Sequence, residues 1–175
     1  DFRKVKEDEI GKFIPSELYG LSKLMMSDIV KEREDILMLN IFACYGIGEK
    51  ESRFPNYAIG QAVKNLPIEI NQNVVFDYLY VDDMVRIVKH FIEHFPKDKI
   101  INITPNNSVS LKETAEIIRK NSGKRFNIII KNSKMNYEYT GDNSILLKNI
   151  PNFEFTPMEI GLKNMYEYNR ERSNV

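Results

Sequence analysis

A tyrosine and a lysine stand four residues apart in the segment Tyr19-Gly-Leu-Ser-Lys23. In a helix, side chains at i and i+4 lie on the same face, with Cβ atoms about 5–6 Å apart. A free phenol has a pKa near ~10, and an adjacent ammonium group favours the phenolate and lowers that pKa. Such a pair can exchange a proton with a hydroxyl or carbonyl group while a cofactor carries hydride. The spacing alone is a weak signal, because many helices contain it by chance around a solvated or core tyrosine.

Two histidines and a cysteine are further candidates for chemistry. His90 and His94 have the i, i+4 spacing of two metal ligands on one helix, but Phe91 stands where a metallopeptidase helix needs glutamate. The sequence offers no third ligand at a useful spacing, so we expect no metal site and a partly exposed helix face. Cys44 has no histidine at nearby spacing and is typical of a small buried apolar residue.

Carboxylates and aromatic residues cluster between positions 76 and 83. The pair Asp82-Asp83 is placed at the start of a predicted helix, where carboxylates act as caps more often than as paired acids. Phe76, Tyr78 and Tyr80 alternate along the chain, as side chains on one face of a half-buried strand do. Stacking of a base on these rings explains the same pattern, and the sequence does not distinguish the two interpretations.

Composition excludes several classes of partner. The 175 residues contain 25 basic and 25 acidic side chains, so no net field favours nucleic acid. No apolar run approaches the roughly 18 residues of a membrane span, and we expect no membrane association. One cysteine excludes an internal disulfide and fits a reducing compartment, so we expect a cytoplasmic protein.

Helical and extended patterns alternate along the chain, which indicates an α/β fold with parallel strand pairing. We predict that residues 1–14 form an exposed charged connection and that residues 44–52 form a loop. Residues 132–157 are predicted to be loop-rich, with short elements at best. We predict helices over 16–33, 53–65, 82–95, 110–122 and 157–170, and strands or extended segments over 36–43, 68–70, 74–81, 99–103 and 126–130.

Local signals fix several helix ends. Ser16 is the expected N-cap of the first helix, with Glu17 in its first turn. Ser110 is the expected N-cap of the fourth helix, and Gly123 suits the left-handed position after its end. Pro157 fits the first position of the last helix.

Five segments together resemble one protein family. Pro15-Ser-Glu-Leu-Tyr-Gly-Leu-Ser-Lys23 is similar to the active-site helix P-x-x-x-Y-x-x-S-K of the extended short-chain dehydrogenase/reductases, the NAD-dependent epimerase/dehydratase family. The acidic segment 5–9, the strand 36–46 ending in Tyr-Gly, the segment Phe76-Asp-Tyr-Leu-Tyr-Val-Asp-Asp83 and the helix start 110–118 also resemble family segments, in family order.

The resemblance implies the end of a Rossmann-type parallel sheet followed by a small α/β substrate-binding lobe. By this analogy residues 1–66 belong to the NAD(P)-binding domain, and residues 67–175 form mainly the substrate lobe, with some return to the sheet. The glycine-rich turn that holds a dinucleotide pyrophosphate is expected before residue 1. Tyr45-Gly-Ile-Gly-Glu49 is the nearest glycine pattern, and we interpret it as a loop.

The resemblance also implies an activity. Tyr19 would be the acid/base, and Lys23 would hold the nicotinamide ribose of NAD or NADP. The substrate would be a nucleotide-diphospho-sugar, oxidised to a 4-keto intermediate that is then epimerised, dehydrated or reduced. The implied cofactor contacts are Tyr19, Lys23, Ile41, Phe42 and Cys44, and the implied substrate contacts are Ala43, Arg53, Phe54, Ile68 and Phe76.

Three residues depart from the family pattern. Asn40 and Phe76 stand where many members carry arginine, and Ala43 stands where many carry asparagine. Either Arg53 or Arg86 replaces the diphosphate-binding arginine, or the substrate differs from the usual nucleotide-diphospho-sugar. Two alternatives to an active enzyme stay open. The chain is a non-catalytic family member that senses a dinucleotide or holds a partner, or it is an isolated lobe with no activity of its own. The resemblance further implies a homodimer, in which the apolar stripe of the helix 16–33 is either core or interface.

Overall fold

The computed structural model describes residues 2–12, 14–105 and 107–173, and it has the expected α/β fold. Its helices are α1 (Leu18–Lys31), α2 (Phe54–Val63), α3 (Val81–Glu93), α4 (Leu111–Ser122), α5 (Ser144–Asn149) and α6 (Met158–Arg172), with a short 3-10 helix at Glu7–Glu9. Its strands are β1 (Phe2–Val5), β2 (Met38–Ile41), β3 (Ala43–Tyr45), β4 (Ile68–Gln72), β5 (Val75–Phe76), β6 (Tyr78–Tyr80), β7 (Ile100–Ile103), β8 (Val109–Ser110), β9 (Ile128–Asn132) and β10 (Tyr139–Gly141).

Strand pairing is mostly parallel, as expected of strands joined by helices. β2 pairs with β7, β3 with β6, and β4 with β9, all in parallel. A four-stranded sheet has the order β1-β10-β5-β8, in which only the β5–β8 pair is antiparallel. Each parallel pair joins segments that are far apart in the sequence.

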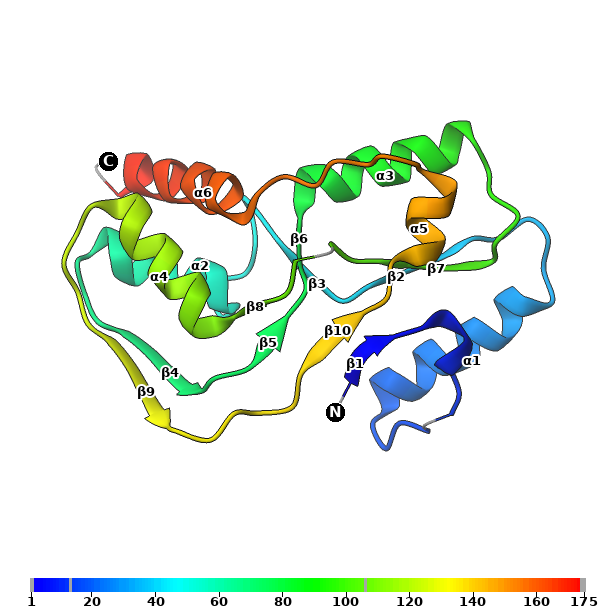
Figure 1. Cartoon of the computed structure of the whole chain (residues 1–175), viewed down its shortest axis with the longest axis horizontal. Coiled ribbons are helices and arrows are strands. Elements are labelled where there is room, and N and C mark those ends of the chain that lie inside the picture. The colour runs from blue at the N-terminus through cyan, green and yellow to red at the C-terminus, as the bar shows by residue number, and fades with distance from the viewer. Residues whose placement is uncertain (1, 13, 106, 174–175) are drawn as a thin grey trace.

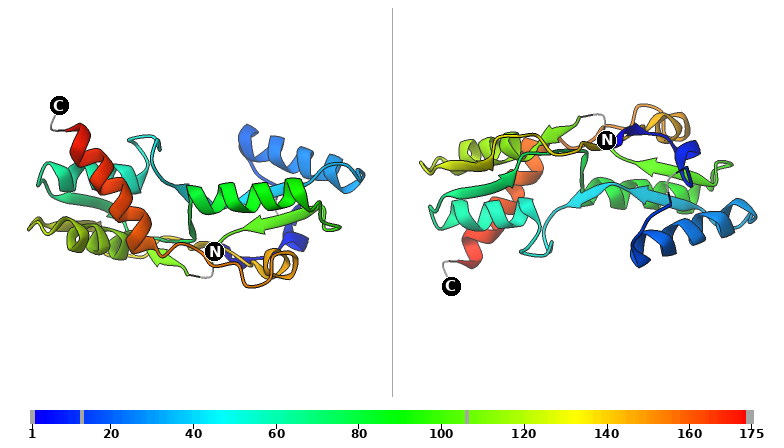
Figure 2. Two further views of the ribbon diagram at one scale, coloured as in Figure 1. Left: turned by 90° about the horizontal axis from the view of Figure 1, so that it is seen from above. Right: turned by 90° about the horizontal axis from the view of Figure 1, so that it is seen from below.

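Two hydrophobic cores organise the molecule. In the first, α2, α4 and α6 pack over β4, around fully buried side chains such as Ile59, Ile68 and Leu162. In the second, α3 and α5 pack against β6 and β7, around Leu79, Ile87 and Ile101. Figure 1 shows the two groups at opposite ends, with β3, β5, β6 and β10 running between them, and the views in Figure 2 show the same separation. The division at residue 66 stays a prediction.

The first residues are more structured than the sequence indicated. Segment 1–14 was expected to be an exposed connection, but β1 pairs in parallel with β10, from Phe2 opposite Tyr139 to Val5 opposite Gly141. The Glu7 carboxylate then accepts a hydrogen bond of 2.7 Å from the backbone amide of Asn102. These contacts reach across the whole chain, so local charge patterning could not reveal them.

The predicted strand 36–43 is two strands in the structure. The chain bends at Phe42, so that β2 pairs with β7 while β3 pairs with β6 and extends to Tyr45. Cys44 therefore lies inside β3 and not in the loop predicted over 44–52. The strand predicted over 126–130 is shifted to β9, and residues 132–157 contain only β10 and α5 as short elements, as expected.

The helix caps match the sequence in part. Ser110 caps α4 by accepting from the Glu113 backbone amide, and Gly123 ends it with φ 64°, as predicted. The prediction for α1 was wrong, because the N-cap is Glu17 and its side chain makes no cap bond. Asp82 and Asp83 are not caps of α3 either: the N-cap is Tyr80, and both carboxylates lie in the first turn.

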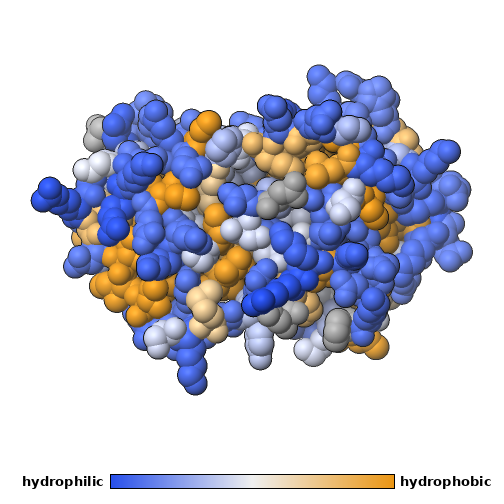
Figure 3. All heavy atoms as spheres, in the orientation of Figure 1, coloured by the Kyte–Doolittle hydropathy of each residue, from blue (hydrophilic) through white to orange (hydrophobic). Residues whose placement is uncertain are grey.

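Charged and polar residues cover most of the face shown in Figure 3, with an apolar area over α4 and β4. Within residues 2–12, 14–105 and 107–173, no helix combines the length and apolar character needed to cross a membrane.

Candidate active site

The first turns of α1 present Tyr19 and Lys23 together. The Tyr19 side chain is 73% exposed, and the Lys23 Nζ lies 5.2 Å from the centroid of its ring. Gly20 allows the start of α1 to approach the preceding loop, because a Cβ at this position would lie 2.6 Å from the Cβ of Pro15. The helix geometry thus brings a phenol and an ammonium group together at an accessible surface.

Tyr139 of β10 lies within electrostatic range of Tyr19, and sequence reasoning missed it. Burial, and secondly the proximity of Tyr19, raise the pKa of Tyr139. Its ring centroid is 5.0 Å from that of Phe42 and 6.3 Å from that of Phe76. The alternation in Tyr137-Glu-Tyr139-Thr was the available signal for a strand here, within a segment that we interpreted as loop-rich. Tyr139 thus belongs to the aromatic cluster of Phe42 and Phe76 and lies within electrostatic range of Tyr19.

The predicted cofactor residues around Phe42 have different surroundings. The Phe42 ring lies against Gly141, where a Cβ would come within 2.6 Å of the ring carbons. Ile41 is exposed at the end of β2, whereas Cys44 is half-buried in β3. Burial, with a smaller effect of the Glu49 carboxylate, raises the pKa of the Cys44 thiol, so it is a poor nucleophile at neutral pH.

Aromatic rings continue from Phe76 into the first core. Phe76 contacts Tyr78 at 5.4 Å between ring centroids, Tyr78 contacts Tyr45 at 6.0 Å, and Tyr45 contacts Tyr80 at 5.4 Å. Burial raises the pKa of both Tyr45 and Tyr78, so these phenols stay protonated. Ala43 is half-buried in β3, directly opposite Tyr78 in the register. This wall of the site is therefore apolar and aromatic.

Glu49 is a second residue that sequence reasoning missed as a candidate. Burial raises its pKa to about 7, although the Asn56 backbone amide and the charge of Arg53 favour the ionised form. Its Oε2 atom is buried and has no hydrogen-bond partner among the residues that the structure describes. The Glu49 backbone carbonyl accepts a bond of 2.6 Å from the Asn56 side chain, which holds the loop against α2. The result is a proton-carrying group near Tyr78 and Cys44.

Arg53 and Phe54 lie at the start of α2, beside a surface hollow. Arg53 is the exposed N-cap residue, and Phe54 is one of the residues that line the hollow, which has a volume of about 460 Å³. Ile68 was predicted to contact substrate, but its side chain is 0% exposed and packs in the first core. Side chains that do line the hollow include Ser52, Tyr57, Glu69, Ile70, Gln72 and Lys131.

The two histidines lie together at the end of α3, His90 in its last turn and His94 just after it, with ring centroids 4.8 Å apart. In the part of the chain that the structure describes, no three His, Cys, Asp or Glu side chains are grouped as a metal site requires.

The sequence model of the NAD dependent epimerase/dehydratase family matches residues 2–104, more than half of the chain. The chain belongs to this family. A search among curated proteins finds no significant match.

Solved structures of an epimerase, of a dehydratase and of a protein named RMD have the same fold as this family member. UDP-glucuronic acid 4-epimerase from Bacillus cereus, in complex with UDP-glucuronic acid and NAD, has a TM-score of 0.80 at 20% identity over 98% of the chain. RMD from Pseudomonas aeruginosa, complexed with NADPH, has a TM-score of 0.79 at 17% identity over 98% of the chain. The dTDP-glucose 4,6-dehydratase from Bacillus anthracis, in complex with NAD, has a TM-score of 0.77 at 18% identity over 91% of the chain. The chain spans 58%, 64% and 54% of these proteins, respectively.

The structure accounts for one departure from the epimerase/dehydratase pattern. Asn40 lies opposite Asn102 in the β2–β7 register and donates a 3.1 Å hydrogen bond to its side-chain oxygen. Asn102 in turn donates to the backbone carbonyls of Val5 and Asp142. An amide at position 40 is thus part of a partly buried network that joins β1, β2, β7 and the residue after β10.

Arg86 of this family member is already engaged with groups of the protein itself. Its Nη2 donates to Asp83 at 2.7 Å and to the Glu154 carbonyl at 2.6 Å, and its guanidinium stacks 4.5 Å from the Phe153 ring centroid. The Arg53 side chain makes no hydrogen bond or ion pair with another described residue, although its charge acts on Glu49. Of the two candidates, Arg53 is therefore the less engaged.

Proposed function

We propose that this chain supplies the acid/base pair and part of the substrate site of an NAD(P)-dependent epimerase, dehydratase or reductase. The substrate is a nucleotide-diphospho-sugar that reacts through a 4-keto intermediate. The observation that supports this most is the exposed Tyr19 with Lys23 Nζ 5.2 Å from its ring, in a chain of the NAD dependent epimerase/dehydratase family. The similar solved structures hold NAD or NADPH, and one also holds UDP-glucuronic acid.

The exposed phenol and ammonium groups are the proposed partners of the nicotinamide ribose, together with Ile41 at the end of β2, Phe42 at the bend and Cys44 within β3. When bound, the dinucleotide supplies the hydride acceptor. Among the described residues no strand is followed by a glycine-rich turn that opens a helix, so this part of the chain provides no cradle for the pyrophosphate.

The chemistry of the chain's own residues is proton transfer. Tyr19, as its phenolate, accepts the proton of the sugar C4 hydroxyl, which makes that carbon a better hydride donor. The positive charge of Lys23 stabilises the Tyr19 phenolate. Arg53 donates to the diphosphate in place of the arginine that Phe76 replaces. Phe76 and Ala43 give the sugar an aromatic and small-residue wall.

Substitution of Tyr19 tests this assignment. Tyr19→Phe removes the proton-transferring oxygen and should lower kcat at least about 100-fold, while calorimetry shows dinucleotide binding retained. Tyr137→Phe is the matched control, because Tyr137 is another exposed tyrosine, at 74%, and it should leave kcat unchanged. Turnover that survives Tyr19→Phe contradicts the assignment. Binding of NAD or NADP without conversion of any nucleotide sugar by the wild-type protein would favour the non-catalytic alternative instead.

We also propose a cytoplasmic homodimer that associates through α1. Leu18, Met25 and Ile29 are 86%, 61% and 52% exposed along one side of this helix, and apolar surface of this kind is typical of an interface. Met25→Asp should shift the mass measured by light scattering from dimer to monomer. A monomeric wild-type protein contradicts this proposal and leaves the Tyr19 assignment untouched.

A further inference from the structure

A basic hollow lies at the end of α4, far from α1 (Figure 1). Its volume is about 540 Å³, and it is lined by residues of α4 and of the segment that leads to β9: Glu116, Arg119, Lys120, Gly123, Lys124, Arg125, Phe126 and Asn127. Four of these side chains are cationic and one is anionic, which leaves a local charge of +3 in a chain whose net charge is zero.

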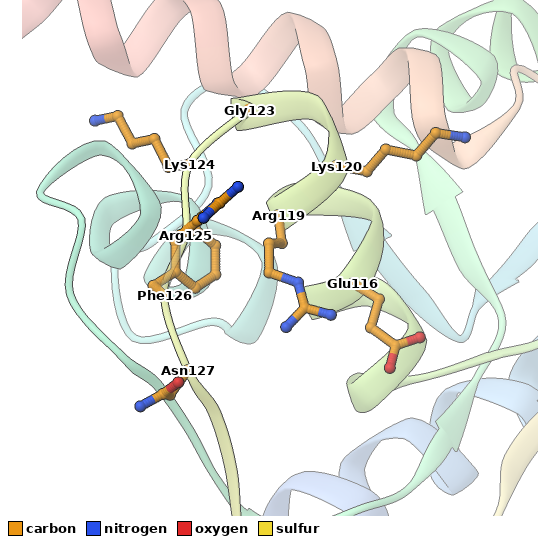
Figure 4. Close-up of a pocket in the computed structure, with 8 residues that line it drawn as sticks. All are labelled: Glu116, Arg119, Lys120, Gly123, Lys124, Arg125, Phe126 and Asn127. Carbon is orange, nitrogen blue, oxygen red and sulfur yellow. The ribbon is translucent and has the colours of Figure 1, made fainter.

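Two guanidinium groups in this hollow lack partners. Arg119 and Arg125 are exposed and make no hydrogen bond or ion pair with any residue that the structure describes. Figure 4 shows the two side chains on either side of the same hollow, whereas Lys120 and Lys124 point away from it. Lys124 is already engaged, since its Nζ donates to the Val63 carbonyl at 2.6 Å.

The helix dipole explains only part of this charge. Cations in the last turn of a helix offset its negative end, which accounts for Arg119. Arg125 comes after the helix, beyond the left-handed Gly123, and the reversal of the chain at that glycine brings it back beside Arg119. Two like charges held near one another repel unless an anion lies between them.

The walls of the hollow are fixed before any ligand arrives. Phe126 is only 8% exposed and belongs to the first core, so it anchors the segment on which Arg125 stands. The Ser122 hydroxyl donates to the Arg119 carbonyl and accepts from the Lys124 backbone amide, which fastens the turn. A site with preorganised walls loses less conformational entropy on binding.

From this geometry we propose that the hollow binds a phosphate-bearing small molecule, with the phosphate between Arg119 and Arg125. A guanidinium group forms paired hydrogen bonds with phosphate oxygens, which an ammonium group does not match. Glu116 and Asn127 at the rim accept and donate hydrogen bonds to hydroxyl groups of an ester. Glu116 retains accepting capacity, because its ion pair with Lys112 spans 3.8 Å. The site is separate from the proposed active site and does not depend on its chemistry.

Calorimetric titration of the protein with pyrophosphate and with glucose 1-phosphate tests this site. Saturable binding should weaken at least about tenfold in Arg119→Gln/Arg125→Gln, and it should weaken further as salt is raised. Lys120→Gln is the matched control at the same helix end, and it should bind like the wild type. Arg53→Gln removes the diphosphate contact proposed at the active site, so binding that this variant loses belongs to that site, and the binding that the double arginine variant loses should persist in it.

Each outcome decides the proposal. Loss of binding in the double variant alone supports it, and tighter binding of glucose 1-phosphate than of pyrophosphate identifies an ester as the ligand. Absence of saturable binding to the wild type overturns it. So does equal weakening by Lys120→Gln, which would indicate a diffuse charge effect, or loss in Arg53→Gln only. Circular dichroism of the double variant verifies its fold, which should be unchanged because both arginines are exposed.

Discussion

Replacing Glu49 by glutamine should stabilise the protein at pH 8 and change its stability little near pH 4.5. Burial raises the pKa of this carboxyl group from its ordinary value of 4.5 to about 7. Between these two pH values the folded protein holds a proton that the unfolded chain has released. The stability contributed by the group is therefore fully present below pH 4.5 and is lost as the pH rises through about 7.

The magnitude follows from the same two values. The difference between 4.5 and about 7 corresponds to at most about 3.4 kcal/mol, at about 1.36 kcal/mol per pKa unit. The side chain is only partly buried, so solvent screening reduces this to roughly 1–2 kcal/mol. Glutamine has nearly the same shape and no charge, so Glu49→Gln should recover this free energy at pH 8.

Urea unfolding at several pH values between 4.5 and 8 measures the effect. The free energy of unfolding of the wild type should fall relative to that of Glu49→Gln across this window. Glu51→Gln is the control, because Glu51 is an exposed glutamate in the same loop, and its stability should follow the wild type. A Glu49→Gln protein that is less stable than the wild type at pH 8, or whose stability has the same pH dependence, refutes the reasoning.

Three other substitutions have expected costs. Asp83→Ala removes a carboxylate that is 1% exposed and accepts hydrogen bonds of 2.8 and 2.7 Å from the Thr156 amide and hydroxyl. This variant should lower the free energy of unfolding by about 3–5 kcal/mol, and a loss under about 1 kcal/mol in urea titration would contradict the expectation. Gly141→Ala places a Cβ 2.6 Å from Phe42 and should cost about 1–3 kcal/mol, with an altered near-ultraviolet dichroism spectrum; an unchanged spectrum would argue against the contact. Ser110→Ala removes the α4 cap and should cost about 1 kcal/mol, which a melting temperature equal to that of the wild type would exclude.

Apolar periodicity and the capping residues at helix ends predicted the helices well, because both depend on local sequence. The apolar stripe of α1, the Ser110 cap and the Gly123 end all depend on residues within a few positions of one another. The strand pairings were not predictable in this way. The Phe42 bend separates β2 from β3 because each pairs with a different distant strand, and no residue near position 42 signals this.

The residues of the candidate site also differ in whether local sequence or distant contacts reveal them. Tyr19 and Lys23 were found from the sequence, because one helical turn joins them. Tyr139 and Glu49 were not, because their environments are made by segments far away in the chain. The contacts of Arg86 also required the structure, since its partners Asp83 and Glu154 are brought together by the packing of α3 against the segment before α6.

The pairing of β1 with β10 has a consequence for the order in which the protein folds. Lys4 and Thr140 are 136 positions apart, yet the Lys4 amide donates to the Thr140 hydroxyl. During synthesis at about 5–20 residues per second, the β1 segment waits roughly 7–30 s for its partner strand to be made. Closing so long a loop is also entropically unfavourable until other contacts have formed. The strand just before the Tyr19 helix is thus fixed late, so assembly of the proposed catalytic face is coupled to completion of the distant lobe.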